Sequence, residues 1–358
     1  MSSINNVKKL LTEQKKTDIL NNVTFKIIKL PAPSAKDIYR NSISALYNIW
    51  FTLTLSNRHL TIFNYNNYLS GHLVNLISRL FSKSLIICCH AEIEMLSSAI
   101  PNGKIALKQR LLNHLFRKNR WSSHLKFLVF GDSIAANLNR ILKDEEKYNK
   151  ILSIDHPYFS SYENAGLTNQ SSNIKIGVVG VIKKEKGLQN LLEIASSLQR
   201  EIKKKSLDII TVSKVVGDTV ALQTLGITIY NVGGKLLSRE EYSQVISSVD
   251  FVYFPYDSNG YRLTASGAVF ESIFSEKPII ALQNDFFKYL FDKYGAFGIL
   301  CESNSDLTKQ INSIISGDIK AEDFISNIRR IKTVLKPEFV SLSFRSQLEL
   351  HYPELKAL

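Results

Sequence analysis

A short segment of the C-terminal half carries the residues best suited to bind a charged ligand. Within 250–281 (DFVYFPYDSNGYRLTASGAVFESIFSEKPIIA), Arg262 precedes a run of small residues that leads into an apolar helix. The N–H groups and the positive dipole end of such a helix bind anions, and Thr264, Ser266 and Gly267 leave room for a phosphate. The same small residues also fit an ordinary cap on a packing helix. The segment therefore predicts either a phosphate site or a capped structural helix.

Glu271 lies one turn further into the same predicted helix, among apolar neighbours. A carboxylate at this position can accept two hydrogen bonds from a vicinal diol such as a ribose. The alternative is a solvent-exposed helix glutamate. Because Ala268, Ile273 and Phe274 surround it, we expect Glu271 to border the same crevice as the phosphate site.

A second candidate anion site lies in 177–187 (GVVGVIKKEKG). A predicted strand runs to Gly180, a lysine-rich turn containing Lys186 follows, and a helix starts after Gly187. The segment lacks both G-x-x-x-x-G-K-[ST] and G-x-G-x-x-G, so neither a P-loop nor a dinucleotide fingerprint is supported. A solvated lysine turn is the alternative to a second phosphate-binding turn.

In the N-terminal half, the apolar strand of 84–94 (SLIICCHAEIE) is followed by His90, Glu92 and Glu94. An imidazole at the end of a strand can take a proton from an attacking hydroxyl near neutral pH or hydrogen-bond a sugar. The alternative is a helix-capping histidine with two solvated acids. The three side chains would converge on a metal only from an extended strand, and no H-E-x-x-H supports them, so no metal is expected.

The elements that position these residues alternate between strands and helices in both halves, which predicts parallel sheets covered on both faces. In the C-terminal half the predicted strands are 174–182, 207–213, 227–232, 251–256 and 278–282, and the predicted helices are 188–204, 238–248 and 268–274. In the N-terminal half the predicted strands are 23–30, 60–65, 84–90 and 127–130, and the predicted helices are 69–81, 105–120 and 134–142.

A polar stretch, SSYENAGLTNQSS at 160–172, separates the halves. The predicted organisation is an N-terminal domain at 1–160, a linker at 161–172, a C-terminal domain at 173–340, and a final helix at 341–358 that crosses back to the first domain. Two doubly wound α/β domains leave a cleft at the carboxyl ends of their strands, where the site is expected. Because a polar segment, 1–21, precedes the first predicted strand, we expect either that the first strand of the N-terminal domain is missing or that this domain is reduced.

Composition restricts the class of protein. A chain of 358 residues with 44% hydrophobic residues is long and apolar enough for two folded domains. Cys88, Cys89 and Cys301 form no C-x-x-C, which argues against a disulfide framework or a thiolate zinc site. No apolar stretch reaches the roughly 18 residues of a membrane span, and 1–16 is too polar for a signal peptide, so a cytoplasmic protein is expected.

The positive charge is concentrated in the first half. Residues 1–172 hold 22 Lys and Arg against 11 Asp and Glu, and so carry +11 of the net charge of +13. Within this half, 103–126 is a basic amphipathic segment without acids, which predicts contact with an anionic membrane surface. A helix packed on the sheet with a solvated basic face is the alternative, and both can hold at once if one face packs and the other meets lipid headgroups. No nucleic-acid module is recognisable, so nucleic acid is not an expected partner.

The two spaced motifs together resemble the donor half of the GT-B nucleotide-sugar glycosyltransferases. The resemblance rests on Gly180 and the E-K-G at 185–187, followed by F-P-Y at 254–256, S-G-A-V-F-E at 266–271 and K-P-I-I-A at 277–281. It covers about half of the chain. It implies that Lys186 approaches the donor diphosphate, that Ser266 and Gly267 bind phosphate through their backbone, and that Glu271 holds the ribose. It also implies that His90 faces the donor sugar.

Two positions depart from the family. An arginine commonly follows the first glycine, where this chain has Val181, and retaining members often have a glutamate eight residues before the ribose-binding one, where this chain has Leu263. Arg262 is the residue expected to supply the missing cation, since a guanidinium matches phosphate oxygens. The expected catalytic residues are therefore His90, Lys186 and Arg262.

The resemblance implies a sugar transfer from a UDP or GDP sugar, without a further cofactor, to a lipid-linked or saccharide acceptor of bacterial capsule, O-antigen or lipopolysaccharide. His90, Glu92 and Glu94 are the acceptor-side candidates. The protein is then expected at the inner face of the plasma membrane. A nucleotide-sugar epimerase of the same architecture, or a non-catalytic or truncated nucleotide-binding protein, would use the same cleft and stays open.

Overall fold

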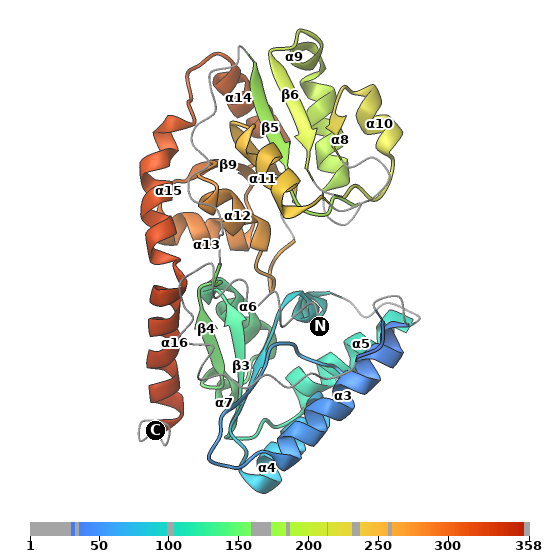
Figure 1. The fold of residues 1–358 in the computed structure, drawn as a ribbon, viewed down its shortest axis with the longest axis vertical. Helices are drawn as coiled ribbons and strands as arrows, with labels where there is room; N and C mark the ends of the chain where they lie inside the picture. The colour runs from blue at the N-terminus through green and yellow to red at the C-terminus, as the bar shows by residue number, and fades with distance from the viewer. Residues whose placement is uncertain are drawn as a thin grey trace.

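The computed structural model describes residues 30–32, 36–98, 104–158, 173–183, 187–212, 214–230, 237–256 and 260–353, without the side chains of 104–106 and 239–240. Figure 1 shows two lobes stacked along the long axis, the lower built from the first part of the chain and the upper from the second. The predicted strand at 23–29, the polar segment 1–21, the linker 161–172 and Lys186 lie outside the described residues.

The N-terminal lobe is a parallel sheet of four described strands in the order β1-β2-β3-β4. The strands are β1 (Thr61–Phe63), β2 (Leu85–Cys88), β3 (Leu125–Phe130) and β4 (Ile151–Ile154). The helices around them are α3 (Asp37–Thr54), α4 (Gly71–Phe81), a 3-10 helix (Ala91–Ser97), α5 (Lys104–Asn113) with a π-helical turn (His114–Lys118), α6 (Asp132–Leu142) and α7 (Glu145–Tyr148). Parallel pairing with helical crossovers requires helices on both faces, and the sequence alternates accordingly.

The C-terminal lobe is a parallel sheet of six described strands in the order β10-β9-β8-β5-β6-β7. Its strands are β5 (Ile174–Val178), β6 (Leu207–Thr211), β7 (Thr228–Ile229), β8 (Phe251–Phe254), β9 (Ile279–Leu282) and β10 (Gly298–Cys301). Its helices are α8 (Leu188–Ser197), α9 (Gln199–Lys203), α10 (Thr219–Thr224), α11 (Arg239–Ser247), α12 (Gly267–Phe274), α13 (Asp285–Tyr294), α14 (Asn304–Ile315) and α15 (Glu322–Val334). The reversal of strand order between β5 and β8 is the switch point at which doubly wound sheets bind ligands.

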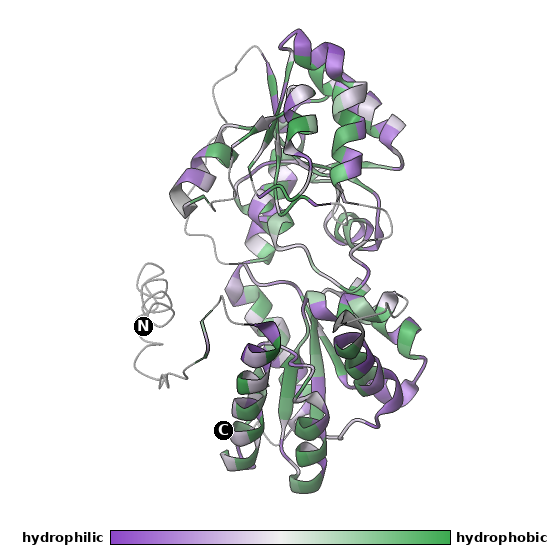
Figure 2. Cartoon of the chain, turned by 90° about the vertical axis from the view of Figure 1, so that its right-hand side faces the viewer, coloured by the Kyte–Doolittle hydropathy of each residue, from purple (hydrophilic) through white to green (hydrophobic). Residues whose placement is uncertain are grey.

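Both sheets are apolar on both faces, as expected for parallel sheets between helices. In the upper lobe, Val252 and Phe254 of β8 face the layer of α11, α12, α13 and α15, whereas Phe251 and Tyr253 face α8, α10 and α14. Figure 2 shows the strands of both lobes as mostly hydrophobic ribbon enclosed by helices of mixed polarity. The core of each lobe therefore fixes where its strands end, and so where the loops at the site begin.

The final helix, α16 (Pro337–His351), lies on the N-terminal sheet although it follows the C-terminal domain. Val340 and Tyr352 pack against Ile86 and Leu128 on the face of this sheet opposite α4. The Tyr352 hydroxyl donates to the Leu85 carbonyl at 2.8 Å, and the Gln347 side chain bonds the backbone of Ser153. The end of the chain therefore stabilises the first lobe.

The sequence predictions did not include every observed element. Among those missed are α3, α7 and β4 in the N-terminal lobe and α10, α13, β10, α14 and α15 in the C-terminal lobe. The basic segment 103–126 packs inward by its apolar side, and contact of its basic side with a membrane stays a prediction. Its apolar residues Leu112, Leu115, Phe116 and Trp121 are buried in the core, with Phe116 and Trp121 edge to face. Among the described helices, none combines the length and hydropathy that a membrane crossing needs.

Candidate functional site

The two sequence motifs meet at the end of β8. Gly187, the N-cap residue of α8, has a φ of +79°, and a Cβ at this position would lie 1.7 Å from the Pro255 carbonyl oxygen. Only glycine allows this approach. Asn190, one turn into α8, donates to the same carbonyl at 3.1 Å. The start of α8 is therefore held directly against the F-P-Y segment.

Tyr256 connects the first motif to the second. A Cβ on Gly180, which has a φ of +87°, would lie 3.0 Å from the Tyr256 hydroxyl oxygen, and this oxygen is 3.5 Å from the Ser266 Oγ. The Tyr256 ring stacks on that of Tyr261 at 4.3 Å between centroids. Because Gly180, Tyr256 and Ser266 converge on one point, the two predicted turns border the same part of the carboxyl edge. Tyr256 belongs to the F-P-Y motif but was not predicted as a site residue.

The N-terminus of α12 leaves space for a ligand. Ser266 is the buried N-cap residue, and its hydroxyl is directed toward Tyr256. Gly267 is exposed, and a Cβ added there would meet no atom of the described structure within 4 Å. The first N–H groups of a helix have no acceptor within it, and the helix dipole makes them favourable for an anion. The arrangement can hold a phosphate in front of Gly267.

Glu271 is half-buried on α12 and receives a hydrogen bond from the Tyr242 hydroxyl of α11. Burial first, and then the Glu271 carboxylate, raise the pKa of Tyr242, so this hydroxyl stays protonated and donates. A carboxylate accepts more than one hydrogen bond, so Glu271 keeps capacity for a diol.

His90 follows β2 at the carboxyl edge of the N-terminal sheet. Its Nε2 lies 2.9 Å from the Asn64 carbonyl oxygen, which can only accept, so Nε2 carries the hydrogen and Nδ1 is the nitrogen that can take a proton. The ring lies 5.0 Å from that of Phe130. His90 is only half-buried. It can therefore act as a proton acceptor through Nδ1.

Glu92 is buried and accepts the His90 backbone N–H at 3.0 and 3.1 Å with its two oxygens. Burial raises the pKa of Glu92, against the hydrogen bonds from the backbone of His90 and Glu92 that lower it. The geometry makes Glu92 a support for the turn that carries His90.

Glu94 reaches across to the C-terminal lobe. Its Oε1 accepts the Arg262 N–H at 3.1 Å, and its Oε2 accepts the Leu263 N–H at 2.7 Å and the Thr264 hydroxyl at 2.8 Å. Leu263 is only 1% exposed and packs in the core of the N-terminal lobe. The residue at the position of the family's first glutamate thus anchors one domain in the other. Thr264 and Glu94 have structural partners that the sequence did not indicate.

Arg262 lies between these contacts. Its backbone carbonyl accepts from Asn137 of α6 at 2.9 Å, while its side chain is exposed. Asn137 also donates to Asp285 of α13 at 3.0 Å. The backbone of Arg262 is therefore fixed by the N-terminal domain through both its N–H and its carbonyl group.

Two further contacts join the lobes. Lys293 of α13 lies 2.8 Å from Asp155 and 3.1 Å from Asp132. The half-buried His156 ring lies between Phe130 and Phe270, 5.2 Å from each, and loss of hydration lowers its pKa. His90, Phe130, His156 and Phe270 form a continuous row of rings from the N-terminal sheet to α12.

The three residues considered as metal ligands point to different partners: the His90 ring to Asn64, Glu92 to the His90 backbone, and Glu94 to the 262–264 backbone. Across the described part of the chain, three His, Cys, Asp or Glu side chains do not gather into a metal-sized group.

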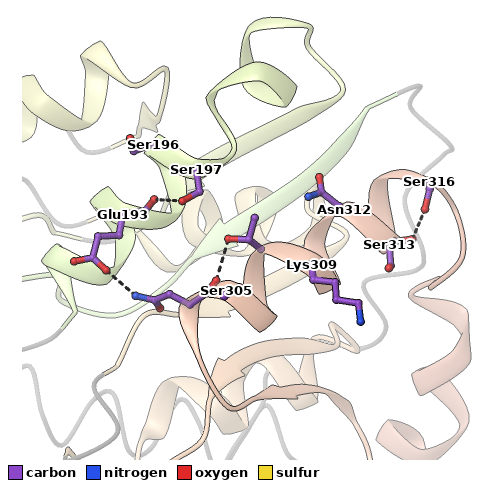
Figure 3. Close-up of a pocket in the computed structure, with 10 residues that line it drawn as sticks. Glu193, Ser196, Ser197, Ser305, Lys309, Asn312, Ser313 and Ser316 are labelled. Atoms are coloured by element: carbon purple, nitrogen blue, oxygen red, sulfur yellow. Dashed lines mark hydrogen bonds between the residues drawn. The ribbon is translucent and has the colours of Figure 1, made fainter.

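A polar groove between α8 and α14 is separate from this site (Figure 3). Most of the residues that line it are serine, threonine or asparagine. The Asn304 amide donates to the Glu193 carboxylate across the groove at 2.8 Å. Both helices pack on the face of the sheet opposite α12. The groove contains none of the predicted site residues.

No protein-family model and no curated protein matches this sequence. Solved structures do match. WaaG, a glycosyltransferase involved in lipopolysaccharide biosynthesis, is similar at a TM-score of 0.61 and 12% identity, with 95% of each chain covered. The lipopolysaccharide outer core galactosyltransferase WaaB in its apo form is similar at a TM-score of 0.56 and 13% identity, over 87% of this chain and 80% of WaaB.

A TarM mutant from S. aureus, solved with fondaparinux, α-GlcNAc-glycerol and UDP, is similar at a TM-score of 0.56 and 10% identity, over 88% of this chain and 59% of TarM. Identities this low establish the fold and leave the reaction to be argued from the site. With its two parallel sheets, this chain has the GT-B fold of these glycosyltransferases, two Rossmann-like domains, as its sequence motifs predicted.

Proposed function

We propose that this protein is a glycosyltransferase that moves a sugar from a nucleotide diphosphate donor to a hydroxyl of a saccharide or lipid-linked acceptor. The observation that carries the proposal is the convergence of Gly180, Tyr256 and Ser266 at one edge of the C-terminal sheet, with open space in front of Gly267. The 90–94 segment of the other domain meets the same loop through Glu94.

The chemistry follows from where charge develops during transfer. As the bond between the sugar and the diphosphate breaks, negative charge grows on the leaving phosphate. The N–H groups at the start of α12 and the Arg262 guanidinium would stabilise that charge. Lys186 is proposed to act beside them, as the sequence motif predicts. Glu271 would orient the ribose, and His90 would contact the donor sugar or take the proton of the acceptor hydroxyl through Nδ1.

The solved structures of the same fold support this choice of substrates. The TarM mutant structure contains UDP together with a saccharide ligand. WaaG is a glycosyltransferase involved in lipopolysaccharide biosynthesis, and WaaB is a lipopolysaccharide outer core galactosyltransferase. We propose a UDP or GDP sugar as donor and an acceptor of bacterial surface polysaccharide. A lipid-linked acceptor would place the protein at the inner face of the plasma membrane, where the basic N-terminal domain would meet anionic lipid.

The donor site can be tested with a variant that leaves the fold intact. Gly267→Ala adds a methyl group where nothing lies within 4 Å, and alanine suits a helix better than glycine, so the melting temperature should not fall. If a phosphate approaches Gly267, the same variant weakens nucleotide binding. Thermal shifts with UDP, GDP, CMP and dTDP sugars, which stabilise the folded state by mass action, measure that binding.

Arg262→Ala should also weaken nucleotide binding, whereas the matched Arg345→Ala on α16, whose arginine pairs with Glu349, should not. Wild-type nucleotide affinity in both Gly267→Ala and Arg262→Ala would reject the proposed donor site. Incubation of the wild-type protein with the bound sugar nucleotide alone separates the remaining functions: an isomerised sugar indicates an epimerase. Binding without turnover of any offered acceptor indicates a non-catalytic protein.

A further inference from the structure

The N-terminal domain exposes an apolar surface on two neighbouring helices. We call it the α3–α4 face. Its side chains are between 44% and 65% exposed, and they are Leu46, Trp50 and Leu53 on α3 and Leu73, Leu76, Leu80 and Phe81 on α4. Single exposed apolar residues are common on soluble proteins, but a continuous set of this size marks an interaction surface.

The two helices form one surface because they run side by side in the same direction. Asn48, in the second half of α3, donates to Ser70, the N-cap residue of α4, at 3.2 Å. Beyond their ends, Asn57 donates to the Phe81 carbonyl at 2.8 Å, and Lys83 donates to the Leu55 carbonyl. Both helices lie at the lower right of Figure 1, on the side of the lobe away from α16.

Each helix presents its apolar residues as a row. Leu46, Trp50 and Leu53 are spaced by four and then three residues, so they lie along one side of α3. Leu73, Leu76 and Leu80 are spaced by three and then four residues and lie along one side of α4. The opposite sides are used internally: Ala45 and Thr52 of α3 and Val74 and Ile77 of α4 are buried. The exposed rows are therefore not needed to hold the helices in place.

Apart from Asp37, the first residue of α3, the charged residues of this part of the chain are basic. None of residues 38–91 is Asp or Glu, whereas Arg40, Arg58, Arg79 and Lys83 lie within the same stretch. Arg58 and Lys83 follow the ends of α3 and α4, where Asn57 joins the Phe81 carbonyl. A protein partner with an apolar core and no acids would fit this surface poorly, whereas an anionic bilayer offers both an apolar interior and negative headgroups.

We infer that the α3–α4 face is a docking surface for an anionic lipid bilayer, with the apolar rows inserted between the acyl chains and the arginines and Lys83 at the headgroups. The basic segment 103–126 does not provide the insertion, because Leu112, Leu115 and Phe116 are in the core. The inference rests on the proposed function only in explaining how a lipid-linked acceptor would reach the site. Binding to vesicles is measured independently of nucleotide binding or sugar transfer.

The protein contains two tryptophans, which makes the test direct. Trp121 is buried in the core, whereas Trp50 is 51% exposed on the α3–α4 face. Vesicles of phosphatidylcholine with one quarter phosphatidylglycerol should shift the tryptophan emission of the full chain to the blue and co-sediment the protein. Vesicles of phosphatidylcholine alone, or added salt, should weaken both signals. The blue shift should be absent in Trp50→Phe, which retains Trp121.

Variants distinguish this face from other exposed apolar residues. Leu46→Gln with Leu80→Gln should abolish most co-sedimentation, and Arg58→Gln should weaken it about fivefold. Leu342→Gln with Leu350→Gln is the matched control, because these leucines are equally exposed on α16, a helix that also carries Glu338 and Glu349. Unchanged melting temperatures show that the variants fold.

Three results would overturn the inference. The first is a wild-type protein that does not bind the anionic vesicles. The second is vesicle binding by the α3–α4 variants that equals that of the α16 control. The third is a wild-type dimer that Leu46→Gln with Leu80→Gln converts to a monomer, since this would make the face a contact between two copies. Loss of vesicle binding with intact UDP binding would leave the proposed donor site standing, and the reverse would leave the docking surface standing.

Discussion

The Oε2 of Glu94 accepts the backbone N–H of Leu263 at 2.7 Å, across the boundary between the two domains. The same carboxylate holds Arg262 and Thr264, and the Leu263 side chain is buried in the N-terminal core. This loop leads directly to the N-terminus of α12. The position of the proposed phosphate site therefore depends on a residue of the opposite domain.

Replacing Glu94 with alanine should loosen this loop. The variant leaves the Leu263 N–H without its acceptor, and hydrogen bonds to a charged group contribute about 1.5–3 kcal/mol. We expect a lower melting temperature and a weaker affinity for the nucleotide, measured by differential scanning fluorimetry and by calorimetric titration. Glu94→Gln keeps a carbonyl oxygen that can accept from Leu263 or Thr264, so it should lie between Glu94→Ala and the wild type. Equal melting temperatures for all three proteins would contradict the structural role of Glu94.

Gly187→Ala should destabilise the C-terminal domain strongly. Its Cβ would meet the Pro255 carbonyl oxygen at 1.7 Å, and its φ is +79°. Gly317→Ala is a matched control with a φ of +84° and nothing within 4 Å of the added Cβ in the described structure. The control should cost only the roughly 1–2 kcal/mol of backbone strain. Urea midpoints of the two variants measure the difference, and equal midpoints would show that the contact with Pro255 is unimportant.

The sequence was sufficient for most strands of the two sheets and for the two motifs, because both depend on local patterns, but β4 and β10 were not predicted. Strand β8 and helix α12, for example, were predicted within two residues of their observed ends. The role of Glu94 was not predictable, since its partners lie about 170 residues away and leave no periodic signal. Segment 103–126 shows the same limit: its amphipathic pattern is equally consistent with a membrane and with the core that it contacts.

Stability should depend on pH through His156. Burial between Phe130 and Phe270 lowers the pKa of this imidazole below its usual value of about 6.5. As the pH falls below about 6.5, the unfolded chain takes up the proton before the folded protein does, so the free energy of unfolding decreases. The melting temperature should therefore drop between pH 7.5 and pH 5.5.

His156→Phe removes the titrating ring while keeping an aromatic neighbour for Phe130 and Phe270. Its drop in melting temperature over this pH range should be smaller than that of the wild type. His59→Phe replaces an exposed histidine and should retain the wild-type drop. If His156→Phe loses as much stability on acidification as the wild type, the row of rings is not the origin of the pH dependence.

The role of His90 can be separated from its structural contacts by His90→Gln. The glutamine amide can still donate to the Asn64 carbonyl, as Nε2 does now, but it has no nitrogen to accept a proton. If His90 is the general base, the turnover number should fall about 100-fold or more, with the nucleotide affinity unchanged. If His90 only orients the donor sugar, the variant should raise KM and keep the pH profile of the wild type. An unchanged turnover number together with an unchanged KM would remove His90 from the site, because neither role allows both values to survive the substitution.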